Sequence, residues 1–120
     1  MLKTSLLILT LMADGGTRVT LTEQDSPDEC EGTRDVITQI LTEADNPPIL
    51  TACGQTELRL TPFEHGVSPE AEINQYRVEI PVSGDFRIAP LATDETCEPD
   101  ASAKPAVYCA RSAQQVIGND

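Results

Sequence analysis

Four cysteines constrain the fold of this 120-residue chain more than any other feature of its sequence. They are Cys30, Cys53, Cys97 and Cys109, and none of their spacings matches the C-x2-C or C-x4-C pairs that structural zinc sites use. Four cysteines permit three disulfide pairings. We favour the two that are local in sequence, Cys30 with Cys53 and Cys97 with Cys109. Each bridge would close a loop of modest length and contribute about 3 kcal/mol to stability.

Crosslinks matter here because the chain is poor in large core residues. Hydrophobic residues make up 39% of the sequence and aromatic residues only 3%, with no tryptophan. The core must therefore be built from Leu, Ile, Val and Ala, without the aromatic anchors that bury about 150–250 Å² each. A chain of 120 residues suits one hydrophobic core. We predict a single domain over residues 1–120.

Disulfides form in oxidising compartments, so the amino terminus is the place to look for a secretion signal. Residues 1–13 fit a short signal peptide, although Leu11 breaks the small-residue rule for cleavage. Alternatively, residues 5–12 are a buried strand, residues 14–16 a tight turn and residues 18–23 the hairpin partner. The first interpretation predicts a periplasmic or secreted protein. The second leaves a cytoplasmic or virion-associated protein open.

The clearest local signal is the start of a helix. Ser26 suits the N-cap, Pro27 the first helical position, and Glu29 completes a capping box. The apolar residues that follow recur at helical spacing on one side: Cys30, Ile37, Leu41 and Ala44, flanked by Val36 and Ile40. Residues 46–48, Asn-Pro-Pro, end the helix because proline has no N–H for the ladder and asparagine tolerates a left-handed cap. The sequence predicts one long amphipathic helix over residues 27–45.

Alternation of apolar and polar residues predicts the strands. Residues 49–53 and 58–61 are expected to form a short hairpin, and residues 75–80 and 85–88 a second. The stretch over residues 62–72 contains prolines and a glycine, which indicates a loop.

The acidic residues 92–108 are expected to form a surface loop whose ends the disulfide of Cys97 and Cys109 ties together. A short helical or extended tail over residues 110–116 follows. Strands gathered around one helix, without βαβ alternation, indicate an α+β fold. We predict a small antiparallel sheet of about five to six strands, in two or three hairpins, packed on the helix and stabilised by disulfides.

Charge limits the classes of partner. Twenty acidic residues against eight basic ones give a formal net charge of −12. A field of this sign repels phosphate backbones and anionic lipid headgroups, so nucleic acid is not an expected partner. No apolar run reaches the ~20 residues that cross a bilayer, so membrane insertion is not expected either. A basic protein would be attracted, although acids also serve simply to keep a small protein soluble.

The sequence lacks the usual catalytic constellations. His65 is the only histidine, no G-x-S-x-G elbow accompanies it, and acidic neighbours oppose a reactive thiolate at Cys30. The acids of residues 94–100 lack the spacing of a calcium loop, and no phosphate-binding pattern is present. We expect no enzyme, cofactor or metal site, with a small enzyme that uses His65 and an acid as an alternative.

The leading functional prediction is a small non-catalytic acidic binding or accessory protein that acts through protein–protein contacts, including inhibition of a cationic protein. Its contact surfaces are expected on two connections of a braced scaffold. The predicted partner-binding residues are Phe63, Glu64, His65, Glu98, Asp100 and Tyr108. The alternative is a structural subunit of a virion or multi-subunit complex, in which the strand Leu6–Met12 pairs or packs against a neighbour.

Overall fold

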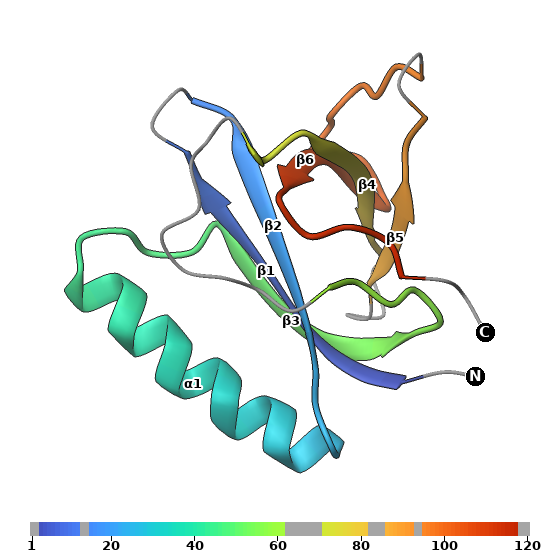
Figure 1. Ribbon diagram of the computed structural model, residues 1–120. Helices are drawn as coiled ribbons and strands as arrows, with labels where there is room; N and C mark the ends of the chain where they lie inside the picture. Colours follow the sequence, from blue (N-terminus) through green and yellow to red (C-terminus); the bar gives the residue numbers. More distant parts are fainter. Residues whose placement is uncertain (1–2, 13–14, 62–70, 82–85, 93–94, 118–120) are drawn as a thin grey trace.

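The computed structural model describes residues 3–12, 15–61, 71–81, 86–92 and 95–117. Its elements are β1 (Lys3–Leu11), β2 (Thr17–Glu23), α1 (Pro27–Glu43), β3 (Leu50–Thr56), β4 (Asn74–Ile80), β5 (Arg87–Pro90) and β6 (Ala106–Ser112). The strands form one curled sheet in the order β3-β1-β2-β6-β4-β5, and α1 lies along its β3–β1 side (Figure 1). The predicted α+β class is confirmed.

Strand β1 is an inner strand because its sequence is an almost unbroken apolar run, which suits a strand covered on both faces. Leu6, Leu7 and Leu9 are fully buried. On one side β1 pairs antiparallel with β2, with Leu7 opposite Leu21, and on the other with β3, with Leu7 opposite Ala52. The predicted hairpin at residues 5–23 is therefore present.

The two faces of β1 enter two separate cores, since successive residues of a strand point to opposite faces. The larger core lies inside the curl of the sheet and draws on every strand. Its buried members are Leu7, Leu9, Val19, Leu21, Ala52, Tyr76, Val78, Phe86, Ile88 and Ala110. The smaller core lies under the helix and consists of Leu6, Ile8 and Cys30, with Ile37, Leu41 and Cys53 packed against them.

Helix α1 begins as the capping box predicts. Ser26 has an extended backbone, and its Oγ accepts a hydrogen bond from the N–H of Glu29 at 3.1 Å. One residue later, Cys30 is fully buried and forms a disulfide with Cys53 of β3. This is the pairing that the spacing favours, and it joins the helix to an edge strand of the sheet.

The helix ends earlier than predicted, at Glu43 after 17 residues, and is not the long helix of residues 27–45. Asp45 takes a φ of 63°, and the N–H of Asn46 donates to the carbonyl of Leu41 at 2.9 Å. This is the hydrogen-bond pattern of a Schellman ending. The left-handed residue is therefore Asp45, not Asn46 as predicted.

The sheet is mixed, which corrects the prediction of an antiparallel sheet. β2 and β6 run parallel, with Arg18 beside Arg111, while the other neighbouring strands run antiparallel. The direction of β6 follows from its long antiparallel pairing with β4, in which Tyr76 lies opposite Ala110. β4 and β5 form the predicted hairpin of residues 75–88.

The predicted hairpin between residues 49–53 and 58–61 is wrong. β3 runs without a turn from Leu50 to Thr56 and pairs along its length with β1. The backbone N–H and C=O groups along the edge of β1 that β2 leaves open are paired by β3. Leu60 forms a bridge with Val116 instead.

The carboxyl-terminal strand starts inside the predicted surface loop of residues 92–108, because β6 begins at Ala106. The disulfide between Cys97 and Cys109 fastens this loop to β6, again as the spacing favours. The bridge therefore holds the loop against β6 at Cys109.

Candidate functional site

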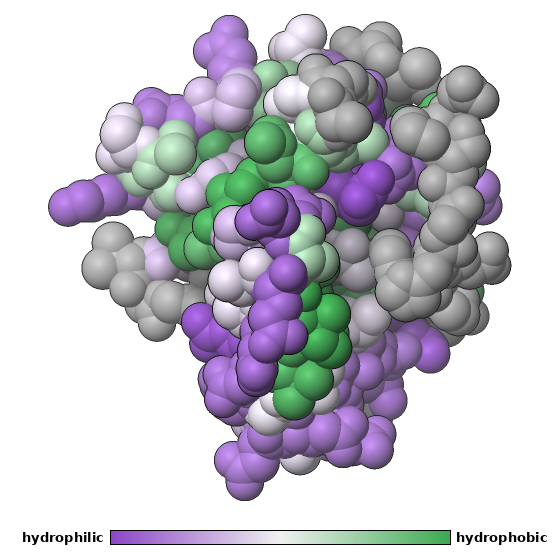
Figure 2. Space-filling view, turned by 90° about the vertical axis from the view of Figure 1, so that its left-hand side faces the viewer, coloured by the Kyte–Doolittle hydropathy of each residue, from purple (hydrophilic) through white to green (hydrophobic). Residues whose placement is uncertain are grey.

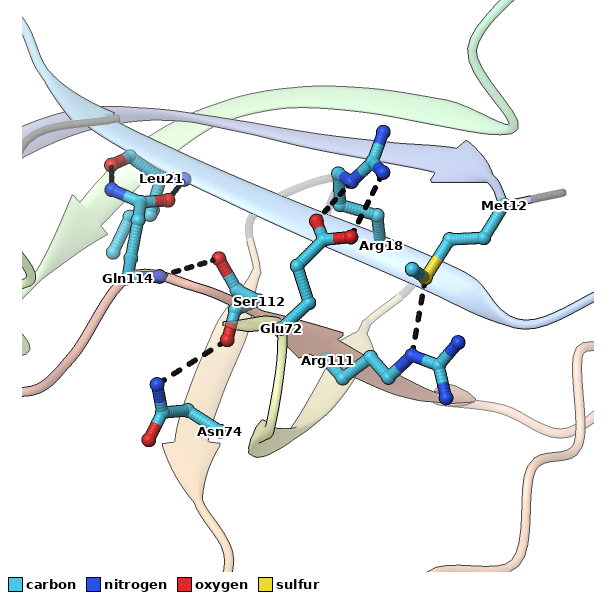
Figure 3. Close-up of polar contacts among 8 residues, drawn as sticks. All are labelled: Met12, Arg18, Leu21, Glu72, Asn74, Arg111, Ser112 and Gln114. Atoms are coloured by element: carbon cyan, nitrogen blue, oxygen red, sulfur yellow. Dashed lines mark hydrogen bonds and ion pairs between the residues drawn. The ribbon is translucent and has the colours of Figure 1, made fainter. Parts of the chain in front are cut away.

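Polar side chains gather where β2 meets β6 (Figure 3). Gln114 is buried there, and its Oε1 accepts from the N–H of Leu21 at 3.0 Å while its Nε2 donates to the Leu21 carbonyl at 2.9 Å. The same Nε2 donates to the Thr61 carbonyl at 2.7 Å. The amide thus pairs with β2 as a strand backbone would, and it extends the short β2–β6 pairing. Gln114 is a structural residue.

An ion pair lies at the same seam. Nε and Nη2 of Arg18 donate to the two carboxylate oxygens of Glu72, the second at 2.9 Å. The Glu72 side chain is only 5% exposed. The hydrogen bond to Glu72, assisted by its charge, raises the pKa of Arg18. Because the two side chains bind each other through two hydrogen bonds, the ion pair holds the residues before β4 against β2.

Two open grooves of about 430 Å³ each indent the described surface. One runs between the two edge strands and is lined by Gln55, Thr56, Glu57, Leu58, Phe86, Arg87 and Ile88. The other is lined by Ile73, Asn74, Gln75, Tyr76, Pro90, Leu91, Ala92 and Val116. Burial raises the pKa of Tyr76, and its hydroxyl donates to the Gln114 carbonyl at 2.8 Å. Neither lining contains a cysteine, histidine or lysine among the described residues.

The described part of the chain contains neither a cluster of potential metal ligands nor a membrane-spanning helix. No group of three or more His, Cys, Asp or Glu side chains in it is arranged to hold a metal ion. None of its helices has the length and apolar character needed to span a membrane.

The structure describes three of the six predicted partner-binding residues. Outside the described residues lie Phe63, Glu64 and His65. Glu98 and Asp100 are exposed on the loop fastened to Cys109. Tyr108 is half-buried and packs against the larger core, and as the neighbour of Cys109 it points to the opposite face of β6. Glu98 and Asp100 lie on the loop beside β6, whereas Tyr108 lies within the strand and packs against the core.

Asp100 helps to build its own loop. Its Oδ1 accepts from the hydroxyl of Ser102 at 2.7 Å and from the N–H of Ser102 at 3.1 Å, which lowers the pKa of the Asp100 carboxyl. Its backbone exchanges two hydrogen bonds of 2.9 Å with Val107 of β6. Of the two predicted acids, Asp100 shapes the loop and Glu98 is left on its surface.

The strongest concentration of charge lies on and beside α1. Residues 25–45 carry seven carboxylates against the single cation Arg34, a net charge of −6 and half of the total for the chain. Arg34 is engaged with Thr51 at 2.9 Å and with Glu31 at 3.3 Å. This acidic element faces solvent along most of its length.

Two apolar residues lie exposed within this acidic surface. Val36 and Ile40 are each 57% exposed, although the sequence pattern places them beside the buried stripe. Among the described strands the helix mainly contacts β3 and β1, and it packs on them through Cys30, Ile37 and Leu41. Figure 2, which faces the end of α1 seen on the left in Figure 1, shows apolar surface directly beside strongly hydrophilic surface.

The exposed side of α1 is therefore the candidate interface that sequence reasoning missed. The sequence did contain a signal for this interface. A helix that packs on one face needs one apolar stripe, and here a second apolar pair at i and i+4 lies beside that stripe. Comparisons of the chain with protein-family models, with curated proteins and with solved structures find no match.

Proposed function

We propose that this chain is a small, non-catalytic acidic binding protein that acts through protein–protein contacts on a cationic partner, including inhibition of a cationic protein. The observation that carries the proposal is the net charge of −6 on residues 25–45, beside the exposed pair Val36 and Ile40. Opposite charge speeds the encounter of two proteins, and exposed apolar residues then supply contact area. Salt should weaken the association because it screens surface charge.

The two disulfides indicate an oxidising, extracellular-type environment. Within that class, we infer a periplasmic or secreted location. A cationic protein secreted into the same compartment is then the natural partner. Nucleic acid is not, because its phosphates carry the same sign of charge as α1.

The alternative of a structural subunit depends on Leu6–Met12 as a contact strand. In the structure these residues belong largely to β1, whose residues Ser5–Leu9 are paired along both edges and buried, whereas Leu11 is 58% exposed. An assembly contact through this strand would be limited to its end at Leu11. The enzyme alternative depends on His65, which lies outside the described residues.

The test is capture of a partner by a matched pair of charge variants. Glu29→Gln with Glu43→Gln removes two charges from α1, whereas Glu95→Gln with Glu98→Gln removes two from the loop after β5. Immobilised wild type and the loop variant should retain the same basic protein from the source organism's extracellular or periplasmic fraction at low salt. The helix variant should lose most of it, and about 0.3 M salt should release it from all three.

Mass spectrometry of the retained protein provides the readout, and its isoelectric point checks that it is basic. Equal retention by the two variants would contradict a role for α1. The absence of any protein whose retention depends on salt would contradict the proposed function itself.

A further inference from the structure

Helix α1 departs from good helix design at three places on its solvent side. Gly32 lies in the middle of the helix, where glycine is among the poorest helix formers. Val36 and Ile40 expose more than half of their surface. Glu43 lies in the last turn, which holds no basic residue to offset the negative end of the helix dipole. Departures of this kind concentrate at functional surfaces.

The fold itself gives no reason for Gly32. A Cβ added at this position would meet no atom within 4 Å, so packing does not require its absence. The residue has helical backbone conformation, so no left-handed φ requires glycine either. What glycine does provide is a stretch of bare helix backbone, which another chain can approach closely.

These departures line up along the helix. Residues spaced three or four apart share one face of a helix. At intervals of three, four, four and three residues, the solvent stripe of α1 consists of Glu29, Gly32, Val36, Ile40 and Glu43. It presents bare backbone and an apolar pair between two carboxylates, on a different side of the helix from the residues that pack on the sheet.

The charges at and beside this stripe determine which kind of partner it can bind. Glu43 and Asp45 add to the partial negative charge at the end of the helix. Glu29 supplies a negative charge at the other end of the stripe. The one cation of the segment, Arg34, is directed to Thr51 of β3 and to Glu31. The complementary occupant is apolar in its centre and positively charged at its ends.

We propose that the solvent stripe of α1 is the docking site for a cationic amphipathic helix of the partner protein. Apolar residues of that helix pack on Val36 and Ile40, its backbone crosses closest at Gly32, and its Lys or Arg side chains pair with Glu29 and Glu43. This inference rests on the proposed function and narrows the partner to a basic helical segment. A second copy of this chain, or an anionic membrane, would bring charge of the same sign.

The experiment uses a synthetic helical peptide of about 18 residues, with Leu and Ala along one face and Lys on the others. Fluorescence anisotropy measures its binding to the intact, disulfide-bonded chain at low salt. Gly32→Leu blocks the close approach and Val36→Ser removes an anchor, and both leave the net charge unchanged. Each should weaken binding about tenfold, as loss of a central contact does. The control Val116→Ser, at a 44% exposed site on the groove beside β4 and β5, should bind as wild type does.

Stability provides a second readout. Leucine and alanine form helices better than glycine, so Gly32→Leu should keep its circular dichroism spectrum and Gly32→Ala should raise Tm by about 4 °C without peptide. A fall in Tm for Gly32→Ala would show that the fold itself needs the glycine and would overturn the inference.

The outcomes separate the inference from the proposed function. If Glu29→Gln with Glu43→Gln weakens binding while Gly32→Leu and Val36→Ser do not, the acidic field alone holds the peptide, and only the docking site is refuted. If wild type binds no cationic peptide at low salt, both are refuted. Equal binding of a peptide with the same residues in scrambled order, or self-association that Gly32→Leu abolishes, would also overturn the docking site.

Discussion

Each half of the sheet carries one disulfide, and the two bridges have different surroundings. In the β3–β1–β2 half, Cys30 of α1 is fully buried against Leu6 and Ile8 of β1. In the β6–β4–β5 half, the bridge from Cys109 holds an exposed loop, and both of its cysteines are half-buried. The first bridge joins a helix to an edge strand beside a buried core, whereas the second joins an exposed loop to a strand.

Chain entropy alone does not distinguish them. Separations of 23 and 12 residues give a stabilisation of about 3 kcal/mol for either bridge, since the dependence on loop length is logarithmic. The difference must come from the native contacts that each bridge supports. A crosslink that supports an apolar layer is coupled to global unfolding, and one that supports a loop is coupled to local opening.

Removing the helix bridge should have the largest effect. We expect Cys30→Ala with Cys53→Ala to lower the free energy of unfolding by about 4–5 kcal/mol. About 3 kcal/mol of this reflects the lost constraint, and the rest reflects the cavity at a fully buried sulfur. Urea denaturation monitored by circular dichroism measures it. A loss no greater than that of the loop-bridge variant would refute the contrast between the two halves.

The seam that joins the halves should come next. Gln114→Ala leaves the N–H and carbonyl of Leu21 and the carbonyl of Thr61 without their side-chain partner, in a buried place. Unsatisfied buried groups are costly, so the expected loss is about 3 kcal/mol. Gln115→Ala is the matched control, because its side chain is exposed, and should change stability by less than about 0.5 kcal/mol. Equal losses would mean that the Gln114 amide is not what joins β2 to β6.

The seam also marks the limit of what the sequence could predict. The helix start at Ser26 and the hairpin of β1 with β2 depend on residues close together in the chain. The first was predicted, and the second was one of the two interpretations of the amino terminus. The β2–β6 contact joins Leu21 to Gln114 across 93 residues. Alternation tells which face of a strand a residue occupies, but not which strand lies beside it. The parallel pairing and the place of β3 therefore came from the structure.

The charge and the apolar positions of the candidate interface could be read from the sequence, but the exposure of those positions could not. Composition gives the acidity, and helical spacing gives the apolar positions. Whether Val36 and Ile40 are buried depends on how many strands the helix covers, which is a property of tertiary packing. The solvent stripe is visible only once α1 is seen to rest mainly on β1 and β3.

A smaller loss is expected from the loop bridge. Cys97→Ala with Cys109→Ala should cost about 2 kcal/mol, less than the full entropic value, because the loop can detach while the sheet stays folded. Hydrogen exchange should show lost protection over residues 95–104, while β6 remains protected between β2 and β4. If β6 loses protection as well, the second bridge supports its half of the sheet as the first does.

The smallest expected effect is a shift in the pKa of one side chain of that loop, Asp100. The hydrogen bonds from Ser102 lower the pKa of Asp100, so the folded loop favours the charged carboxylate. Their stabilising contribution is therefore present above the ordinary Asp pKa and is lost as the pH falls through the lowered folded value. Ser102→Ala removes the hydroxyl donor and should return the Asp100 pKa towards its ordinary range in an NMR titration of the carboxyl carbon.

The same titration sharpens the contrast between the bridges. In the Cys97→Ala, Cys109→Ala chain, an Asp100 pKa that stays low would mean that the turn of Asp100 and Ser102 is ordered by its own hydrogen bonds. A pKa that returns to the ordinary range would mean that the loop has no order without its crosslink. In that case the loop would depend on the bridge for its order, whereas we expect α1 to keep the apolar contacts of Ile37 and Leu41 in the Cys30→Ala, Cys53→Ala chain.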